Sequence, residues 1–285
     1  MTNKLFIELN NLMIKHRFKP KKKFSQNFLI NQAMIEKIVS FAELDKKDTV
    51  LEIGAGTGFL TKELLSHCKI IAVEIDSFLN DALEEKFEKE LKEKKLELIK
   101  EDFLKAEIPS FNKVVSLPPY RISTPILFRL MNEKLDFALL VFQKDYAVKL
   151  LSEPGFSEYT SSVVLVNYFF EPEILIESVQ ASSFFPLPRT ESALIKFTSK
   201  KRFGKAKNDK KFIKFIKEVF RFKNKNLQNA LQKAFPFIEK EMNLNKTILQ
   251  ELIKSGKFSE LLNEKVMLLE ISELVELFNE LMKKH

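Results

Sequence analysis

The stretch Val50-Leu51-Glu52-Ile53-Gly54-Ala55-Gly56-Thr57-Gly58-Phe59-Leu60-Thr61 decides the fold of this chain. It reads as an apolar strand, a glycine turn and the start of a helix. The chain holds six glycines among 285 residues, and three of them lie in this turn. Glycine permits a sharp turn and lets a ligand approach the backbone closely. The stretch therefore predicts a loop that cradles a small molecule.

An acidic residue lies at the end of each of the next two expected strands. Glu74 ends the apolar run 70–74, and Asp102 follows the run 96–100. An acid at the first of these tips can accept two hydrogen bonds from a ribose diol, and one at the second can accept from an adenine amine. The alternating glycines depart from the dinucleotide spacing and are typical of class I methyltransferases, whose cofactor is S-adenosylmethionine. We expect the cofactor to contact Gly54, Gly56, Glu74 and Asp102.

Short apolar runs alternate with helical patterns through the first two thirds of the chain, which predicts a parallel sheet with helical crossovers. The expected strands are 49–53, 70–74, 96–100, 113–116 and 137–142. The helical patterns between them include 61–66, 77–94 and 124–132. Two later runs, Ser161–Phe170 and Ala193–Phe197, also read as strands, and they predict an antiparallel hairpin at the far edge of the sheet.

The pattern becomes purely helical beyond a polar, basic linker at 200–211. The expected helices are 212–222, 227–235, 248–254, 258–263 and 271–283. We therefore predict an α/β fold: a Rossmann-like, mostly parallel sheet of the class I methyltransferase type, followed by a small all-helical domain. Residues 1–199 form the catalytic domain, with 1–23 as a basic amino-terminal extension, and residues 200–285 form a helical RNA-binding domain.

Composition excludes several classes of protein. Hydrophobic residues make up 45% and charged residues 30% of the chain, which is typical of a globular protein. No run of eighteen apolar residues and no secretory signal pattern is present, and Cys68 is the single cysteine. We therefore expect no membrane span, no disulfide, no metal site and a cytoplasmic location. Because no heptad pattern or extra apolar face is evident, we expect a monomer.

Positive charge is concentrated in two parts of the chain. The net charge is +8, and Lys and Arg greatly outnumber Asp and Glu in 1–23 and in 200–233. Such clusters indicate a polyanionic partner such as RNA. A solvated lysine-rich surface is the alternative interpretation.

Four further segments narrow the class of enzyme: Phe24–Leu29 (FSQNFL), Ser116–Tyr120 (SLPPY), Ser183–Ser192 (SFFPLPRTES) and Phe220–Leu231 (FRFKNKNLQNAL). With these segments the chain resembles, over nearly its whole length, the ribosomal small-subunit RNA adenine dimethyltransferases, relatives of the erythromycin-resistance methyltransferases. The resemblance implies that the first segment closes over the methionine end of the cofactor through Gln26, Asn27 and Leu29. The family usually has Gly where this chain has Ser25.

The second segment resembles the loop that holds the target amine in aminomethyltransferases. There, hydrogen-bond acceptors hold the amino hydrogens and an aromatic ring stacks on the base, so that positioning and electrostatics carry the reaction. The resemblance gives the stacking role to Tyr120. Leu117 occupies the usual Asn position and has no acceptor on its side chain. Either Ser116, which we also expect to touch the cofactor, supplies the acceptor, or the backbone carbonyls of Leu117 and Pro118 supply it.

The remaining two segments are assigned to the target RNA by the same resemblance. Phe184 is the second base-stacking residue, opposite Tyr120, because a target adenine removed from its RNA context needs aromatic or apolar surfaces on which to stack. The resemblance assigns phosphate contacts to basic residues at 220–231, with a structural helix cap as the alternative. Concentrated positive charge suggests the same role for the end of the amino-terminal extension. The residues are Lys21, Lys22, Lys23, Arg221, Lys223 and Lys225.

The resemblance implies dimethylation of two adjacent adenines near the 3′ end of small-subunit ribosomal RNA, during ribosome biogenesis. A second hypothesis is an RNA-binding assembly or transcription factor that kept the fold and lost catalysis. Leu117, and the absence of the family's Gly-Arg at 160–161, favour it, whereas the intact glycine turn and acids oppose it. A third is a resistance methyltransferase that acts on large-subunit RNA.

Overall fold

The computed structural model describes residues 3–21, 26–199, 203–244 and 246–283. The chain divides into two compact units. The first holds residues 1–147 and 172–199, and the second holds 148–171 and 200–285. The second unit thus includes a segment, 148–171, that the sequence analysis assigned to the catalytic domain.

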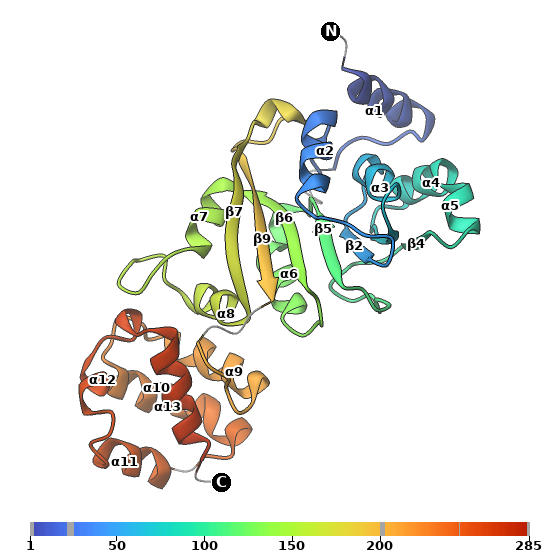
Figure 1. The fold of residues 1–285 in the computed structure, drawn as a ribbon. Helices are drawn as coiled ribbons and strands as arrows, with labels where there is room; N and C mark the ends of the chain where they lie inside the picture. Colours follow the sequence, from blue (N-terminus) through green and yellow to red (C-terminus); the bar gives the residue numbers. More distant parts are fainter. Residues whose placement is uncertain (1–2, 22–25, 200–202, 245, 284–285) are drawn as a thin grey trace. The chain divides into compact units, whose positions relative to one another are not determined.

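Within the described residues, the first unit is built on a sheet with the strand order β4-β3-β2-β5-β6-β9-β7 (Figure 1). The strands β2 to β6 pair in parallel, and β9 pairs antiparallel to β6. This arrangement confirms the predicted mostly parallel Rossmann-like sheet. The strands are β2 (Thr49–Ile53), β3 (Lys69–Val73), β4 (Leu96–Ile99), β5 (Lys113–Ser116), β6 (Phe137–Gln143), β7 (Phe170–Val179) and β9 (Ser192–Ser199).

The connections between the parallel strands hold the helices α3 (Phe59–Leu64), α4 (Ser77–Lys86), α5 (Glu88–Lys92) and α6 (Ser123–Leu130). The helix α2 (Gln32–Ser40) precedes β2, and α7 (Lys144–Leu150) follows β6. The single helix predicted over 77–94 is two helices, broken at Phe87, whose backbone leaves the helical region at φ −118° and ψ 27°. The side chain of Phe87 is 4% exposed because it packs beside Gly58 at the start of α3.

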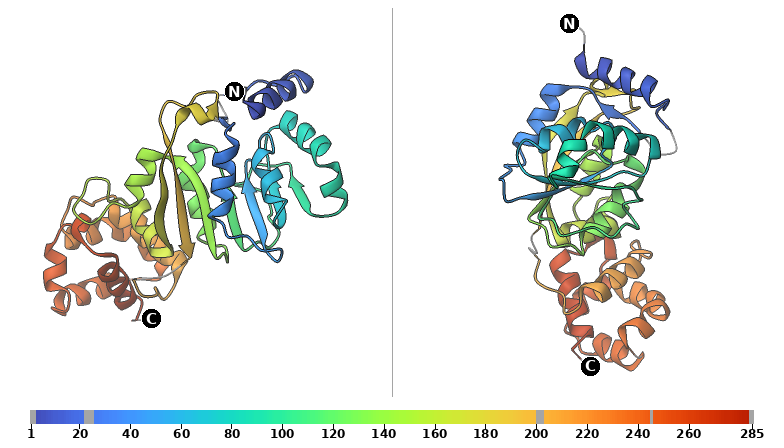
Figure 2. Two further views of the ribbon diagram at one scale, coloured as in Figure 1. Left: turned by 45° about the horizontal axis from the view of Figure 1, so that its top comes forward. Right: turned by 90° about the vertical axis from the view of Figure 1, so that its right-hand side faces the viewer.

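The amino-terminal helix α1 (Lys4–Lys15) lies against the first unit (Figure 2). Glu8 of α1 accepts a bond of 2.9 Å from the ammonium of Lys86 on α4. The Phe6 ring packs edge-on against Phe185, with centroids 5.2 Å apart. Phe185 belongs to the short strand β8 (Phe184–Phe185), which pairs antiparallel with β1 (Phe28–Leu29).

The prediction of a strand at Ser161–Phe170 was wrong. These residues form α8 (Ser161–Phe169), and the strand β7 follows it. Six of the nine residues of α8 are buried, so the helix lacks the polar face that reveals a helix in sequence, and its valines favour a strand reading. Pro172 obscured β7, but β7 ends the strand order, where proline is tolerated.

The second unit is helical outside the first residues of β7. Its helices are α8, α9 (Asp209–Phe220), α10 (Leu227–Met242), α11 (Lys246–Lys254), α12 (Ser259–Asn263) and α13 (Ile271–Leu281). Phe212, Phe215 and Phe278 are fully buried at its centre, with ring centroids 5.2–6.4 Å apart. The helix α10 was expected to end at Phe235 but continues through Pro236, because Ile238 and Met242 bury their side chains on the same face.

No helix of the described residues is long and apolar enough to cross a membrane.

Candidate functional site

A cavity of about 330 Å³ lies at the carboxyl ends of the parallel strands of the first unit. Ligand sites of open α/β sheets lie at this edge, and the volume falls in the range of small-molecule sites. Its lining brings together most of the residues predicted to bind cofactor or target: Gln26, Asn27, Gly54, Gly56, Glu74, Asp102, Leu117, Pro118, Tyr120 and Phe184. Leu29 and Ser116 are not part of this lining.

The glycine turn forms the floor between β2 and β3. The N–H of Gly54 donates to the carbonyl of Val73 at 2.7 Å, and the N–H of Gly56 donates to the Glu74 carboxylate at 2.9 Å. Gly56 has φ +56°, and a Cβ there would lie 3.2 Å from the Phe28 ring. A side chain at this position would therefore strain the backbone and press on the amino-terminal segment.

Glu74 is held rigidly at the tip of β3. Its Oε2 accepts from Gly56, its Oε1 accepts from the N–H of Asp76 at 2.9 Å, and the side chain is 6% exposed. Burial raises the pKa of Glu74, and the two backbone hydrogen bonds oppose that shift. Each carboxylate oxygen keeps a second lone pair, so this fixed carboxyl group can still accept hydrogen bonds from a ligand diol.

The tip of β4 supplies the second acid. Asp102 caps its own loop, since its Oδ1 accepts from the N–H of Leu104 at 3.0 Å. Phe103, which is 4% exposed, and Ile75, which is 47% exposed, add apolar wall to the cavity. Sequence reasoning missed these two wall residues, although each directly follows an acid that it had selected.

The amino-terminal segment meets the cavity through a short pairing that the sequence did not reveal. Phe28 pairs with Phe185 and Leu29 with Phe184, so two motifs far apart in sequence share one wall. Gln26 is fixed by its amide, which donates to Asp76 at 3.0 Å and accepts from the N–H of Lys21 at 2.7 Å. Phe24 and Ser25 lie outside the described residues.

The loop after β5 decides which acceptors the target amine would meet. The hydroxyl of Ser116 is fully buried, donates to the carbonyl of Ile53 at 2.6 Å and accepts from its N–H at 3.1 Å. It therefore ties β5 to β2, and Ser116 is not part of the cavity lining. The loop itself presents Leu117, Pro118 and Tyr120 to the cavity. Of the two sources of an acceptor left open by the sequence, this geometry favours the backbone carbonyls of the loop.

Comparison with known proteins identifies the family of this chain. Residues 17–268 match the family model of the ribosomal RNA adenine dimethylases. The chain belongs to the ribosomal RNA adenine dimethylase family. It is 32% identical over 261 residues, 90% of this chain and 91% of the relative, to a probable ribosomal RNA small subunit methyltransferase A of Pyrococcus furiosus. It is 39% identical over 230 residues, 76% of this chain and 82% of the relative, to ribosomal RNA small subunit methyltransferase A of Clostridium botulinum.

A solved structure supports the same family assignment. The dimethyladenosine transferase of Plasmodium falciparum superimposes with a TM-score of 0.74 at 25% identity, covering 87% of this chain and 94% of that one. The fold is that of the class I methyltransferases, and family membership makes this chain a ribosomal RNA methyltransferase.

Two of the predicted phosphate-binding lysines, Lys21 and Lys223, bind other groups of the protein. The ammonium of Lys21 forms an ion pair of 2.8 Å with the buried Asp76. That of Lys223 donates to the carbonyls of Ser157 and Tyr159, at 2.5 and 3.2 Å. Both cations therefore have structural partners. Lys22 and Lys23 lie outside the described residues.

Two of the predicted basic residues present their side chains at the surface of the helical unit. Lys225 is exposed, and Arg221 is half-exposed, with its guanidinium 2.7 Å from Glu218 and 4.7 Å from the ring centroid of Phe237. Phe237 is itself 49% exposed, so a cation and an aromatic ring lie together on this surface.

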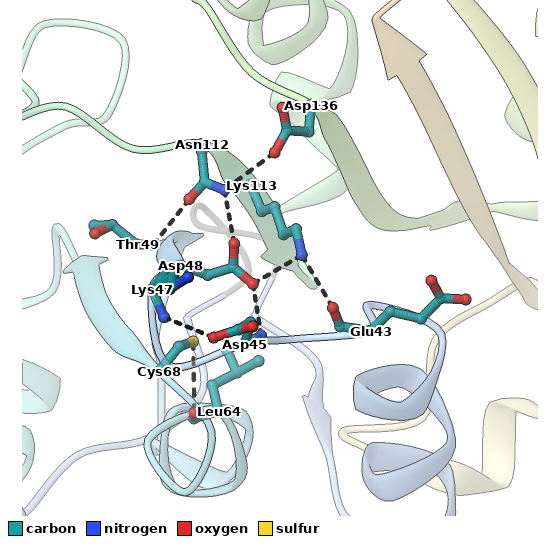
Figure 3. A network of polar contacts seen from close by, with 10 residues as sticks. All are labelled: Glu43, Asp45, Lys47, Asp48, Thr49, Leu64, Cys68, Asn112, Lys113 and Asp136. Carbon is teal, nitrogen blue, oxygen red and sulfur yellow. Dashed lines mark hydrogen bonds and ion pairs between the residues drawn. The ribbon is translucent and has the colours of Figure 1, made fainter.

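The opposite, amino-terminal edge of the sheet also holds a polar cluster, which Figure 3 shows from close by. Asp48, just before β2, accepts from the amide of Asn112 at 2.7 Å and pairs with the ammonium of Lys113 at 2.8 Å. Asn112 also donates to Asp136 and accepts from the N–H of Thr49. These bonds lower the pKa of Asp48 against the opposing effect of its burial, which is the largest single influence. The cluster joins the starts of β2, β5 and β6.

Proposed function

We propose that this chain transfers methyl groups from S-adenosylmethionine to the exocyclic amine of adenines in small-subunit ribosomal RNA. The targets are two adjacent adenines near the 3′ end, each dimethylated during ribosome biogenesis. The observation that carries the proposal is that the acids Glu74 and Asp102 and the Pro118-Pro119-Tyr120 loop line the same cavity. Family membership supports the reaction type.

The residues present fit S-adenosylmethionine. Glu74 and Asp102 stand at neighbouring strand tips, as ribose and adenine recognition require, and Ile75 and Phe103 offer apolar surface to a ring between them. Among the described residues, the lining holds three acids, Glu74, Glu101 and Asp102, against the one cation Arg121, and an excess of acids suits a cationic ligand. When bound, S-adenosylmethionine supplies an electrophilic methyl group on a sulfonium. Gln26 and Asn27 would lie along its methionine portion.

The chain's own contribution to the reaction is positioning. Tyr120 and Phe184 would hold the flipped adenine by stacking, and the carbonyls of Leu117 and Pro118 would accept its amino hydrogens. Such fixed acceptors keep the nitrogen lone pair directed at the methyl group and avoid reorganisation during transfer. Because Ser116 is fully buried and does not line the cavity, we assign no acceptor role to its hydroxyl.

A direct experiment is to incubate the protein with tritiated S-adenosylmethionine and under-methylated small ribosomal subunits, then digest the RNA and identify the labelled nucleoside. The proposal predicts labelled dimethyladenosine near the 3′ end. Label in large-subunit RNA alone would instead identify a resistance-type methyltransferase. The Glu74→Ala variant serves as the negative control, because it removes the carboxylate proposed to recognise the cofactor.

A second candidate, an RNA-binding assembly factor without catalysis, is favoured by one observation. Leu117 stands at the usual Asn position and lines the cavity, and the neighbouring Ser116 hydroxyl is unavailable to the target. Tight binding of cofactor and subunits with no transferred label would establish this candidate and overturn the proposed catalysis.

A further inference from the structure

We infer that Ser192, at the start of β9, is a positioning residue for methyl transfer: its hydroxyl fixes the ring of Tyr120 in the cavity wall where the target base stacks. The inference rests on the proposed function and goes beyond it, because Ser192 does not line the cavity and contacts neither ligand in that proposal.

The carrying observation is one hydrogen bond. The Tyr120 Oη and the Ser192 Oγ lie 2.6 Å apart, and Ser192 is fully buried. A buried hydroxyl requires a partner, and each of these two groups provides it for the other. Burial also raises the pKa of Tyr120, so its phenol stays protonated at neutral pH. Tyr120 therefore offers a ring held at its tip, and it does not act as a base.

The other end of Tyr120 is fixed as well. Its carbonyl accepts from the hydroxyl of Ser123 at 2.9 Å, and the two prolines before it restrict the backbone. A tyrosine fixed only at its backbone can still rotate about two side-chain bonds. The bond to Ser192 removes this freedom, so the ring is oriented before the base arrives.

Ser192 can serve as an anchor because its own strand is firmly attached. It pairs with Gln143 at the end of β6, and the N–H of Lys144 donates to the carbonyl of Glu191 at 3.0 Å. The amide of Gln143 donates to the hydroxyl of Thr190 at 3.2 Å. These contacts give the Gln143-Lys144 pair, which the proposed chemistry does not use, a structural purpose.

The bond also joins the two aromatic walls. Phe184 and Ser192 lie in the same segment, whose β8 part pairs with Leu29. Tyr120 comes from the loop after β5, on a different element. A shift of either wall relative to the other would change the width of the slot for a base, and the hydroxyl bond opposes that shift.

The test is a double-mutant cycle with Ser192→Ala and Tyr120→Phe, both of which remove the bond while Tyr120→Phe keeps the ring. We measure kcat, the KM for RNA and the Kd for S-adenosylmethionine. Each single variant should lower kcat about tenfold and leave the cofactor Kd within about twofold of wild type. The double variant should be no slower than either single variant, because the second change removes nothing further. Ser192→Cys, which keeps the size and a weak donor, should restore part of kcat.

A matched control is available at Tyr146, whose phenol makes a bond of 2.8 Å with the hydroxyl of Thr124 and which, like Tyr120, is partly buried. Tyr146 does not line the cavity. Tyr146→Phe should therefore leave kcat unchanged. That result would show that losing a tyrosine hydroxyl bond does not by itself lower kcat. A kcat for Ser192→Ala within about twofold of wild type, or additive losses in the double variant, would overturn the inference.

A second readout separates this inference from the proposed function. A short single-stranded RNA that carries one 2-aminopurine loses fluorescence when that base stacks on an aromatic ring, whether or not a methyl group is transferred. With S-adenosylhomocysteine present, wild type should quench it, and Ser192→Ala should quench it less. If wild type transfers no methyl group but quenches more than Ser192→Ala, the proposed catalysis fails and the base-positioning role stands. If wild type transfers methyl groups and Ser192→Ala quenches equally, the positioning role fails alone.

Discussion

The two edges of the central sheet carry the same kinds of residue and use them differently. Glu74 at the carboxyl edge and Asp48 at the amino edge are both buried carboxyl groups with several hydrogen-bond donors. Glu74 accepts from the backbone N–H groups of Gly56 and Asp76 and lines a cavity. Asp48 also accepts from one backbone N–H, that of Asp45, but it is tied to the side chains of Asn112 and Lys113 (Figure 3). The comparison teaches that a buried acid marks a ligand site only where the loops around it leave space.

The largest expected effect is at the carboxyl edge. Glu74→Ala should lower the affinity for S-adenosylmethionine about 100-fold or more, since each lost hydrogen bond to a charged group costs about 1.5 kcal/mol or more. Titration calorimetry measures this loss. Glu74→Gln, which keeps one acceptor for the N–H of Gly56 or Asp76, should lose less. Wild-type affinity in both variants would break the comparison, because Glu74 would then be as purely structural as Asp48.

A pH effect follows from Glu52, which also belongs to the carboxyl half of β2. Burial raises its pKa from 4.5 to about 8, although the hydroxyl of Thr61 donates to it at 2.7 Å. Between these two pH values the folded state keeps a proton on Glu52 that the unfolded state releases. The contribution of Glu52 to stability is therefore fully present below pH 4.5 and is lost as the pH rises through 8. The loss should be on the order of 3 kcal/mol.

Urea unfolding at pH 5, 6.5 and 8 measures how the free energy of unfolding changes with pH. Glu52→Gln, which cannot ionise, should flatten most of the decline over this interval. A decline equally steep in Glu52→Gln would show that other groups cause it.

At the amino edge the expected loss is of stability alone. Asp48→Ala leaves the largely buried ammonium of Lys113 without its carboxylate, which should cost about 2 kcal/mol or more of unfolding free energy. The affinity of the folded protein for S-adenosylmethionine should not change. A large drop in cofactor affinity for Asp48→Ala, at temperatures where the variant is fully folded, would contradict the claim that the amino edge is purely structural.

The sequence predicted the sheet well because its strands are bounded by polar loops and carry continuous apolar runs. Its acids were found for a geometric reason: the carboxyl ends of parallel strands share an edge, so Glu74 and Asp102 had to converge. The helix α8 was misread because burial on all sides removes the helical pattern. The pairing of β1 with β8 and the bond between Tyr120 and Ser192 join residues distant in sequence. No local sequence pattern predicts either contact.

The smallest expected effects are at the RNA-binding residues, where the same distinction applies. Lys225→Ala should weaken RNA binding a few-fold and reduce the slope of log affinity against log salt by about 1, as one lost phosphate contact does. Lys223→Ala should instead lower stability, because its ammonium holds the carbonyls of Ser157 and Tyr159. Filter binding at several salt concentrations measures the RNA affinity of both variants, and urea unfolding measures their stability. The reverse pattern would contradict this assignment.

The measurement that tests the central claim most directly is a crystal structure with S-adenosylhomocysteine. We predict the ligand in the carboxyl-edge cavity, with its ribose hydroxyls on Glu74, its adenine between Ile75 and Phe103 near Asp102, and the Asp48 cluster unchanged. A ligand bound anywhere else, or one that leaves Glu74 without a contact, would contradict the claim that this edge of the sheet is the cofactor site.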